Sequence, residues 1–364
     1  MAKYLVKFQP VDMFFFGQET KYRPKKKDGK IIFEADYFQK SAFFPQQTTV
    51  LGALRYLLLQ KHGQIPIRDQ ATAEKLIGPE SFNASQSGQQ DFGIIKRISP
   101  VYLAVDEHFY MPAPKDICKR EKEGNIVEAE KMNFDFENNR LPVIDNYSPK
   151  EGLFDGMVRL TSFDVLNYTK TDENKYDYVF VEVEKVGINK KQSEDAFYKQ
   201  ISCKPNQGKN IAFVVEAEIE EDGLENEVFH IPVGAEKHTF RVEFLKNKSL
   251  PEIKYQLRLK NNVDNPPAVL LISDTFVDDE ANDLFSFSIS GVKPFRYLLT
   301  KTGPDVKYGH FSVSKNRLQL FQRGSIFFFE TEDNLNAFLD AIKQHENFVQ
   351  IGYNHYLTLK NSKL

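Results

Sequence analysis

The stretch PQQTTVLGALRYLLL, residues 45–59, decides how the N-terminal part of this chain folds. Its large apolar side chains recur at the spacing of one helical face: Val50, Leu51, Leu54, Leu57 and Leu58. Pro45 favours extended chain before the helix, and Thr48 or Thr49 is a suitable N-cap. The stretch therefore predicts an amphipathic helix that begins near residue 48.

A strand precedes this helix at Lys3–Phe8, where Tyr4, Val6 and Phe8 fall on one face and Leu5 on the other. A strand, a long excursion and a helix are the beginning of a ferredoxin-like β-α-β unit. After it, residues 62–150 are irregular, with short strands expected at 92–98 and 101–105. The charged stretch 116–139 is interpreted as a surface excursion.

The second half repeats the mixture of strands and a helix. Strands are predicted at Tyr178–Ile188, Ile211–Ile219, Thr239–Leu245, Ala268–Ile272 and Phe348–Leu359, with a short helix at 160–169.

A hairpin is predicted from Leu318–Phe321 and Ser325–Phe329, and it precedes an amphipathic helix at Asp333–His345 capped by Thr331 or Asp333. We predict an α+β protein of two ferredoxin-like domains with long loop and hairpin insertions, at residues 1–150 and 151–364.

The bulk composition is that of an ordinary globular protein. The chain has 364 residues, 41% hydrophobic and 27% charged, and a net charge of −3, so any nucleic-acid site must be a local patch. Cys118 and Cys203 lie far apart and form no metal-binding pattern, so we expect no metal, cofactor or disulfide framework. The apolar runs are too short to span a bilayer, and the N-terminus begins directly with a strand pattern. We therefore expect a cytoplasmic protein without a membrane partner.

Signatures of catalysis are mostly missing. The sequence has no dinucleotide-binding glycine motif, Walker loop, His-Glu-x-x-His or Gly-x-Ser-x-Gly. Only His62, at the end of the first helix, is placed where a general base for RNA cleavage could lie, and a surface role is more common for a single histidine. The acidic run at 274–280 could hold metal ions, but charge runs are usually solvated loops.

A basic cluster lies just after the first strand. Residues 21–30 carry six positive charges against the single negative charge of Asp28, and Asp28-Gly29 is a hairpin-turn signal. Such a loop could neutralise RNA phosphates while Tyr22 stacks on a base, although a solubilising loop has the same composition. The candidate RNA-binding residues here are Lys21, Tyr22, Arg23, Lys25, Lys26 and Lys27.

Other candidate RNA contacts are scattered along the chain. Lys40 and Arg55 flank the first helical motif, and the turn with Lys204, Asn206 and Lys209 could present backbone amides and ammonium groups to a phosphate. The first turn of the helix, with Thr48 and Thr49, could direct its amides at a phosphate, and Gly52 would allow close approach to RNA or to the sheet.

Two early motifs resemble a known family. Residues 10–16, PVDMFFF, with Arg23-Pro24, and residues 44–55, FPQQTTVLGALR, resemble CRISPR RAMP proteins, in particular the third subunit of the type III-B Cmr effector complex. Residues 186–189 with 196–198, and RGSIFFF at 323–329, resemble later segments of that family in the same order. Gly17 stands where the family often has Arg, and Met13 where it often has Pro.

The resemblance implies two RRM-related ferredoxin-like domains and an RNA-binding role without catalysis. Such a subunit would hold the repeat-derived 5′ handle of the crRNA between the large cyclase/polymerase subunit and a backbone RAMP subunit, and it would meet target RNA only indirectly. It adds Arg323, in the glycine-containing segment near the end of the chain, to the candidate RNA-binding residues.

Two alternatives remain open. One is a metal-independent RAMP endoribonuclease that processes precursor crRNA with His62 as general base. The other is a scaffold that contacts only protein subunits through its phenylalanine-rich strands.

Overall fold

The structure is a computed structural model of the 364-residue chain. It describes residues 1–18, 22–27, 30–35, 38–122, 126–136, 141–162, 164–166, 178–188, 197–259, 266–303, 312–315 and 317–359. In these ranges strands predominate and helices are few, as the predicted α+β class requires.

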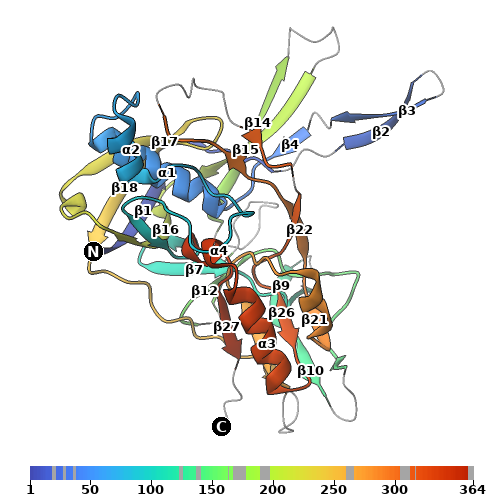
Figure 1. The fold of residues 1–364 in the computed structure, drawn as a ribbon. Coiled ribbons are helices and arrows are strands. Elements are labelled where there is room, and N and C mark those ends of the chain that lie inside the picture. Colours follow the sequence, from blue (N-terminus) through green and yellow to red (C-terminus); the bar gives the residue numbers. More distant parts are fainter. Residues whose placement is uncertain are drawn as a thin grey trace.

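A nine-stranded sheet forms the centre of the molecule (Figure 1), with β1 (Ala2–Pro10) between β16 (Ile211–Ile219) and β18 (His238–Lys246), antiparallel to both. Its order along the main path is β13 (Val165–Leu166), β12 (Met157–Arg159), β7 (His108–Pro112), β6 (Tyr102–Val105), β16, β1, β18 and β17 (Val228–Val233), while β5 (Ile95–Ile98) also pairs with β16.

The side chains of β1 alternate between two faces, as predicted, and both faces are buried. Tyr4, Val6 and Phe8 lie in one hydrophobic core, and Leu5 lies in a second core on the opposite face. A strand in the middle of a sheet that is covered on both sides buries both sets of alternate side chains.

The helices α1 (Gln47–Lys61) and α2 (Gln70–Ile77) cover the first face of the central sheet. All five apolar residues predicted for the α1 stripe are buried, which confirms the helix. The predicted cap is wrong: Gln46 is the N-cap, without a side-chain bond, and both threonines lie within the first turn. Asp69 caps α2 by accepting from the Ala71 amide.

A second, four-stranded sheet packs on the other face of the central sheet. Its order is β21 (Phe287–Ile289), β26 (Ile326–Phe328), β20 (Ala268–Leu271) and β27 (Tyr356–Leu359). Ala268 and Leu270 share a core with Leu5 of β1, whereas Val269 and Leu271 face α3 (Glu332–Lys343). The layers therefore run α1 and α2, central sheet, second sheet, α3.

α3 matches its prediction closely. Leu335, Phe338, Leu339 and Ile342 are buried on one face, as their spacing requires. Thr331 is the N-cap, and its side chain accepts a hydrogen bond from the Asn334 amide at 3.1 Å.

The predicted hairpin at 318–329 is wrong. β25 (Leu318–Phe321) pairs with β22 (Val292–Phe295), whereas β26 pairs with β20 and β21. Since Ile326 and Phe328 face one core and Phe327 another, β26 needs a covered position inside the second sheet. The connecting loop packs instead on residues 113–115: Lys115 N donates to the Gly324 carbonyl at 2.8 Å.

Three further predictions differ from the structure. The 116–139 segment is not merely a surface excursion: β8 (Ile117–Lys122) and β9 (Ile126–Lys131) form a ribbon, β10 (Asn133–Asp135) follows, and Cys118 and Phe134 are buried. Within the described part of 160–169 there is a turn and β13 rather than a helix. The Ser162 hydroxyl donates to Asp164 there at 2.7 Å, a bond that favours turns.

The C-terminal strand is shorter than predicted. α4 (Glu346–Gln350) occupies its first part, and the chain then turns through Gly352 and Asn354, both with positive φ, before β27 begins. Gly and Asn tolerate this left-handed backbone, which neither helix nor strand can continue.

Two ribbons project from the same side of the molecule (Figure 1). One is the predicted basic hairpin, with β2 (Tyr22–Lys27) antiparallel to β3 (Lys30–Ala35); its Asp28-Gly29 turn lies outside the described residues. The other joins β14 (Phe180–Ile188), β15 (Phe197–Pro205) and β4 (Phe38–Lys40).

The remaining elements are short. They are β11 (Val143–Ile144), β19 (Arg258–Leu259), β23 (Leu298–Leu299), β24 (Ser312–Val313) and the 3-10 turns at Leu224–Asn226 and Asp279–Asp283. Strand pairing in the central sheet crosses residue 150, and the boundary between domains 1–150 and 151–364 stays a prediction. None of the described helices is long and apolar enough to cross a membrane.

Candidate nucleic-acid interface

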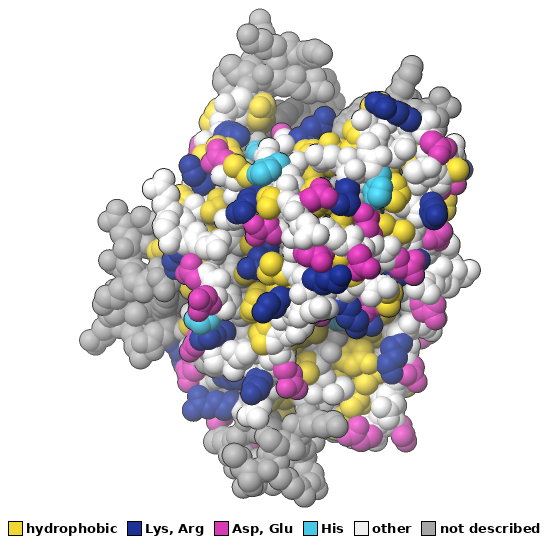
Figure 2. Space-filling model, turned by 90° about the vertical axis from the view of Figure 1, so that its left-hand side faces the viewer, with side chains coloured by type: hydrophobic (Ala, Val, Ile, Leu, Met, Phe, Trp, Pro, Cys, Tyr) yellow, Lys and Arg dark blue, Asp and Glu magenta, His cyan; other side chains and the backbone are white. Residues whose placement is uncertain are grey.

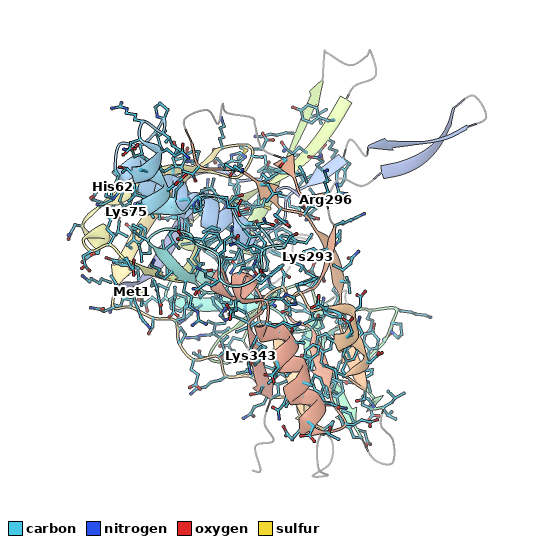
Figure 3. All side chains as sticks on the ribbon, in the orientation of Figure 1. Met1, His62, Lys75, Lys293, Arg296 and Lys343 are labelled. Carbon is cyan, nitrogen blue, oxygen red and sulfur yellow. The ribbon has the colours of Figure 1, made fainter. Side chains whose placement is uncertain are left out.

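A cleft of about 1360 Å³ lies where distant segments of the chain converge. The N-terminus of α1 and the chain before it form one wall, and β22 with the 322–323 loop forms another. Residues 112–115 and 153–156 form the floor. Figure 3 labels Lys293 and Arg296, which lie along β22 and immediately after it.

The cleft is lined by more positive than negative side chains. Asp155 and Asp274 are its two carboxylates, against five cations: Lys115, Lys293, Arg296, Arg317 and Arg323. Low-dielectric walls focus the field of such an excess, which attracts anions. In contrast, Figure 2 shows positive and negative side chains interspersed on the face to the left in Figure 1, without a large area of one sign among its described residues.

Asp274 holds two of these cations. Its Oδ2 lies 2.5 Å from Lys293 Nζ and 3.8 Å from Arg323 Nη2, and its Oδ1 accepts from the Arg323 amide at 3.0 Å. Burial would raise the pKa of Asp274, but Lys293 and Arg323 outweigh burial and keep it below its ordinary value. The carboxylate of Asp274 is therefore ionised at neutral pH.

Arg323 lies at the junction of three segments. Its Nη1 donates to the Val101 carbonyl at 3.2 Å, and its guanidinium carbon lies 5.0 Å from the centre of the Phe44 ring. Its side chain is only 12% exposed. The predicted residue therefore lines the cleft and lies over an aromatic ring of the N-terminal motif.

Lys115 is a partly buried cation on the cleft floor. Its Nζ donates to Gln322 Oε1 at 3.1 Å. Burial lowers the pKa of Lys115, and Asp155 and Asp274 oppose that effect. Phenylalanine rings also line the cleft: Phe43 and Phe44 are partly exposed, whereas Phe16 and Phe154 are buried. Aromatic faces beside cations are the combination that single-stranded nucleic acids bind, by base stacking and phosphate pairing.

The first turn of α1 is fixed by the C-terminal part of the chain. Gln47 Nε2 donates to the Ser99 carbonyl at 2.9 Å, and Gly352 packs directly against this amide. Thr49 lines the cleft, and Thr48 lies in the same helical turn. The motifs around residues 44–49, 323–324 and 351–352 thus meet at one site.

Several predicted contacts lie elsewhere. Lys40 pairs with Glu182 at 2.5 Å, Lys204 pairs with Asp12 at 3.3 Å, and Asn206 Nδ2 donates to the Tyr178 carbonyl at 2.9 Å. Lys209 lines a separate pocket of about 400 Å³ beside Arg241. These residues keep positions at or near the surface, but the fold does not bring them into the cleft.

Two predicted residues of α1 differ from their expected setting. Arg55 is buried: its Nε donates to the Ile77 carbonyl at 3.0 Å and its Nη2 to Thr302 Oγ1 at 3.1 Å. Burial lowers the pKa of Arg55 to about 10. Gly52 is exposed, and no atom would lie within 4 Å of a Cβ added there, so close packing on the sheet does not require glycine.

The basic hairpin is described only by its backbone. Tyr22, Arg23, Lys25, Lys26 and Lys27 lie on β2. Their side chains and the whole of Lys21 lie outside the described residues.

The two features considered for catalysis do not form one site. His62 caps the far end of α1, where its Nε2 lies 3.1 Å from both carboxylate oxygens of Glu221 (Figure 3). The acidic run also diverges: Asp274 faces the cleft cations, whereas Asp278 contacts Gln344 and His345. Among the described residues no group of three or more His, Cys, Asp or Glu side chains could hold a metal ion.

Sequence reasoning missed most of the cleft cations. Lys115, Lys293, Arg296 and Arg317 belong to no charge run, and only the fold brings them together. Lys293-Pro294-Phe295-Arg296, in which cations alternate with an aromatic residue, is the one local signal that could have indicated them.

The chain matches known proteins over nearly its whole length. Chains in two cryo-EM structures of the type III-B Cmr-beta complex are similar: one bound to cognate target RNA and AMPPnP (14% identity, 97% of this chain and 96% of that chain covered, TM-score 0.45). The other is bound to cognate target RNA (12% identity, 98% of this chain and 96% of that chain covered, TM-score 0.46). No curated protein matches. Residues 6–361 match the family described as CRISPR-associated protein (Cas_Cmr3), and the chain therefore belongs to this family.

Proposed function

We propose that this protein is a non-catalytic RNA-binding subunit of a type III-B CRISPR effector complex, whose cleft holds the 5′ handle of the crRNA. In that position it links the large cyclase/polymerase subunit to the backbone subunits for antiviral defence. The observation that carries the proposal is the cleft itself, which five cations and four phenylalanine residues line together with Gln46 and Thr49 at the N-terminus of α1.

The chemistry of a single-stranded handle suits this cleft. Its phosphates would pair with Lys293, Arg296 and Arg323, and its unstacked bases would meet the partly exposed ring of Phe43. Amides in the first turn of α1 add partial positive charge. The layers α1 and α2, sheet, sheet, α3 support two ferredoxin-like domains packed through their sheets.

An endoribonuclease role is the second candidate, and geometry opposes it. The cleft lies at the N-terminus of α1 and His62 at its C-terminus, about 20 Å away for a 15-residue helix. RNA held in the cleft would therefore not place its backbone beside this imidazole without spanning the length of the helix.

The test is binding of a fluorescent single-stranded RNA with the repeat-derived handle to the full chain. Lys293→Ala and Arg296→Ala should each weaken binding by about three- to tenfold, because each removes a charge-assisted phosphate contact. Each should also lower the salt slope by about 0.7. Lys75→Ala and Lys343→Ala are matched controls, since both are exposed lysines away from the cleft (Figure 3).

Absence of binding by the wild type would refute RNA binding, and equal losses in the two controls would refute the cleft as its site. Incubation with repeat RNA in chelator tests the enzyme alternative, because specific cleavage that is lost in His62→Ala would overturn the non-catalytic role. Crosslinking from the handle in the assembled complex tests the scaffold alternative, which predicts no RNA adduct.

A further inference from the structure

The carboxylate of Asp274 is an unexpected feature of a cleft that attracts anions. Its side chain is only 4% exposed and lies against Lys293 and Arg323. A negative charge beside phosphate-binding cations opposes RNA by simple electrostatics. We propose that Asp274 is nevertheless a positioning residue for RNA binding, which orients the ammonium of Lys293 toward the cleft; this rests on the function proposed above.

The first support is the geometry of Lys293. Lysine is a flexible side chain with three donors on its ammonium group. One donor is directed to Asp274 Oδ2 at 2.5 Å, and the side chain remains 32% exposed. A fixed ammonium with two further donors available for a ligand loses less conformational freedom when a phosphate binds than a freely rotating one.

The second support is the way in which Asp274 is itself held. Its Oδ1 accepts from the Arg323 amide, its carbonyl accepts from the Asn354 amide at 3.1 Å, and the neighbouring Thr275 exchanges two backbone hydrogen bonds with Phe321. These hydrogen bonds fix the carboxylate of Asp274 to the 321–323 segment. It can therefore hold the ammonium of Lys293 at one position in the cleft.

The two cations depend on Asp274 to different degrees. Arg323 is also held by the Val101 carbonyl and by the ring of Phe44, so its guanidinium keeps two supports without the carboxylate. Lys293 has Asp274 as its ion-pair partner. Loss of the carboxylate should therefore act on RNA chiefly through Lys293.

The acidic run at 274–280 thus divides into residues with different settings. Asp274 faces the cleft, whereas Asp278 is half exposed and contacts Gln344 and His345. Asp278→Asn changes the net charge by the same amount as Asp274→Asn and touches none of the cleft cations. It is the matched control for any long-range effect of charge.

The experiment is a double-mutant cycle with the fluorescent handle RNA and the full chain. Asp274→Asn should weaken binding by no more than Lys293→Ala does, about threefold or more, although it raises the net charge, and it should lower the salt slope as Lys293→Ala does. In the Lys293→Ala background the same substitution should change the dissociation constant less than twofold. Asp278→Asn should leave binding unchanged or slightly tighter.

Each other outcome overturns the inference. Tighter or unchanged binding by Asp274→Asn would make the carboxylate a simple electrostatic brake. An equal loss in both backgrounds would show a general structural role, which thermal unfolding of each variant would reveal independently. If the wild type binds RNA and Lys293→Ala weakens that binding, either of these results for Asp274→Asn rejects only the role of Asp274. If the wild type does not bind RNA, or if Lys293→Ala binds as tightly as the wild type, the proposed function of the cleft is rejected instead.

Discussion

Asp116 lies at the base of the β8–β9 ribbon, where the Tyr255 hydroxyl donates to its Oδ1 at 2.6 Å. Among the described residues its Oδ2 has no hydrogen-bond partner, and the side chain is fully buried. Burial raises the pKa of Asp116 from 3.8 to about 6, although Tyr255 and Lys131 both act to lower it. Asp116 lies in the stretch that the sequence predicted to be a surface excursion. Its burial therefore leads to a pH dependence of stability that the sequence alone did not predict.

The folded state binds this proton more tightly than the unfolded chain does. The contribution of Asp116 to the free energy of unfolding is therefore greatest below pH 4. It falls as the pH rises through about 6, by about 3 kcal/mol in all. Asp116→Asn, which cannot ionise, should lack this loss. Denaturant unfolding of both proteins from pH 4 to 7 measures this loss, and a difference between them that is independent of pH would contradict the raised pKa of Asp116.

At the scale of elements, the sequence predicted helices best, because the spacing of apolar residues on one helical face is a local pattern. The α3 stripe and its Thr331 cap follow from spacing and local hydrogen bonding, and both are confirmed. The predicted 318–329 hairpin failed because its two strands belong to different sheets, which depends on partners far away in the chain. The cleft was predictable only in part, through Thr49 and Arg323, since its other cations converge through tertiary packing.

The contact between α1 and the turn at Gly352 is an element-scale prediction of this kind. A Cβ on Gly352, where φ is +95°, would lie 1.7 Å from Gln47 Nε2 and 2.4 Å from the Ser99 carbonyl oxygen. Gly352→Ala should therefore lower the free energy of unfolding by about 2 to 4 kcal/mol. Denaturant unfolding measures the change.

Gly52→Ala is its control, because this exposed helical position has space for a methyl group and no positive φ. It should raise the free energy of unfolding by up to about 1 kcal/mol. Equal destabilisation by both substitutions would contradict the proposed packing of Gly352. Unchanged RNA affinity in Gly52→Ala would also remove Gly52 from the candidate RNA contacts.

At the scale of the whole molecule, the basic hairpin and the cleft are separate sources of positive charge. Within the described residues β2 and β3 pair only with each other, and the ribbon projects from the body on the side of β4 and β22 (Figure 1). If the cleft binds RNA as proposed, a strand that leaves it on this side would meet the hairpin, and we expect the hairpin to extend the same binding surface.

Replacement of Lys25, Lys26 and Lys27 by Ala tests this extension. If each lysine pairs with one phosphate, the salt slope for handle RNA should fall by about 2, because each phosphate contact on a single strand contributes about 0.7. The melting temperature should stay the same, because among the described residues β2 and β3 pair only with each other. Combined with Lys293→Ala, the reductions in slope should add, because the two sites neutralise different phosphates. A triple variant with wild-type slope and affinity would leave the hairpin as a solubilising ribbon and confine RNA binding to the cleft.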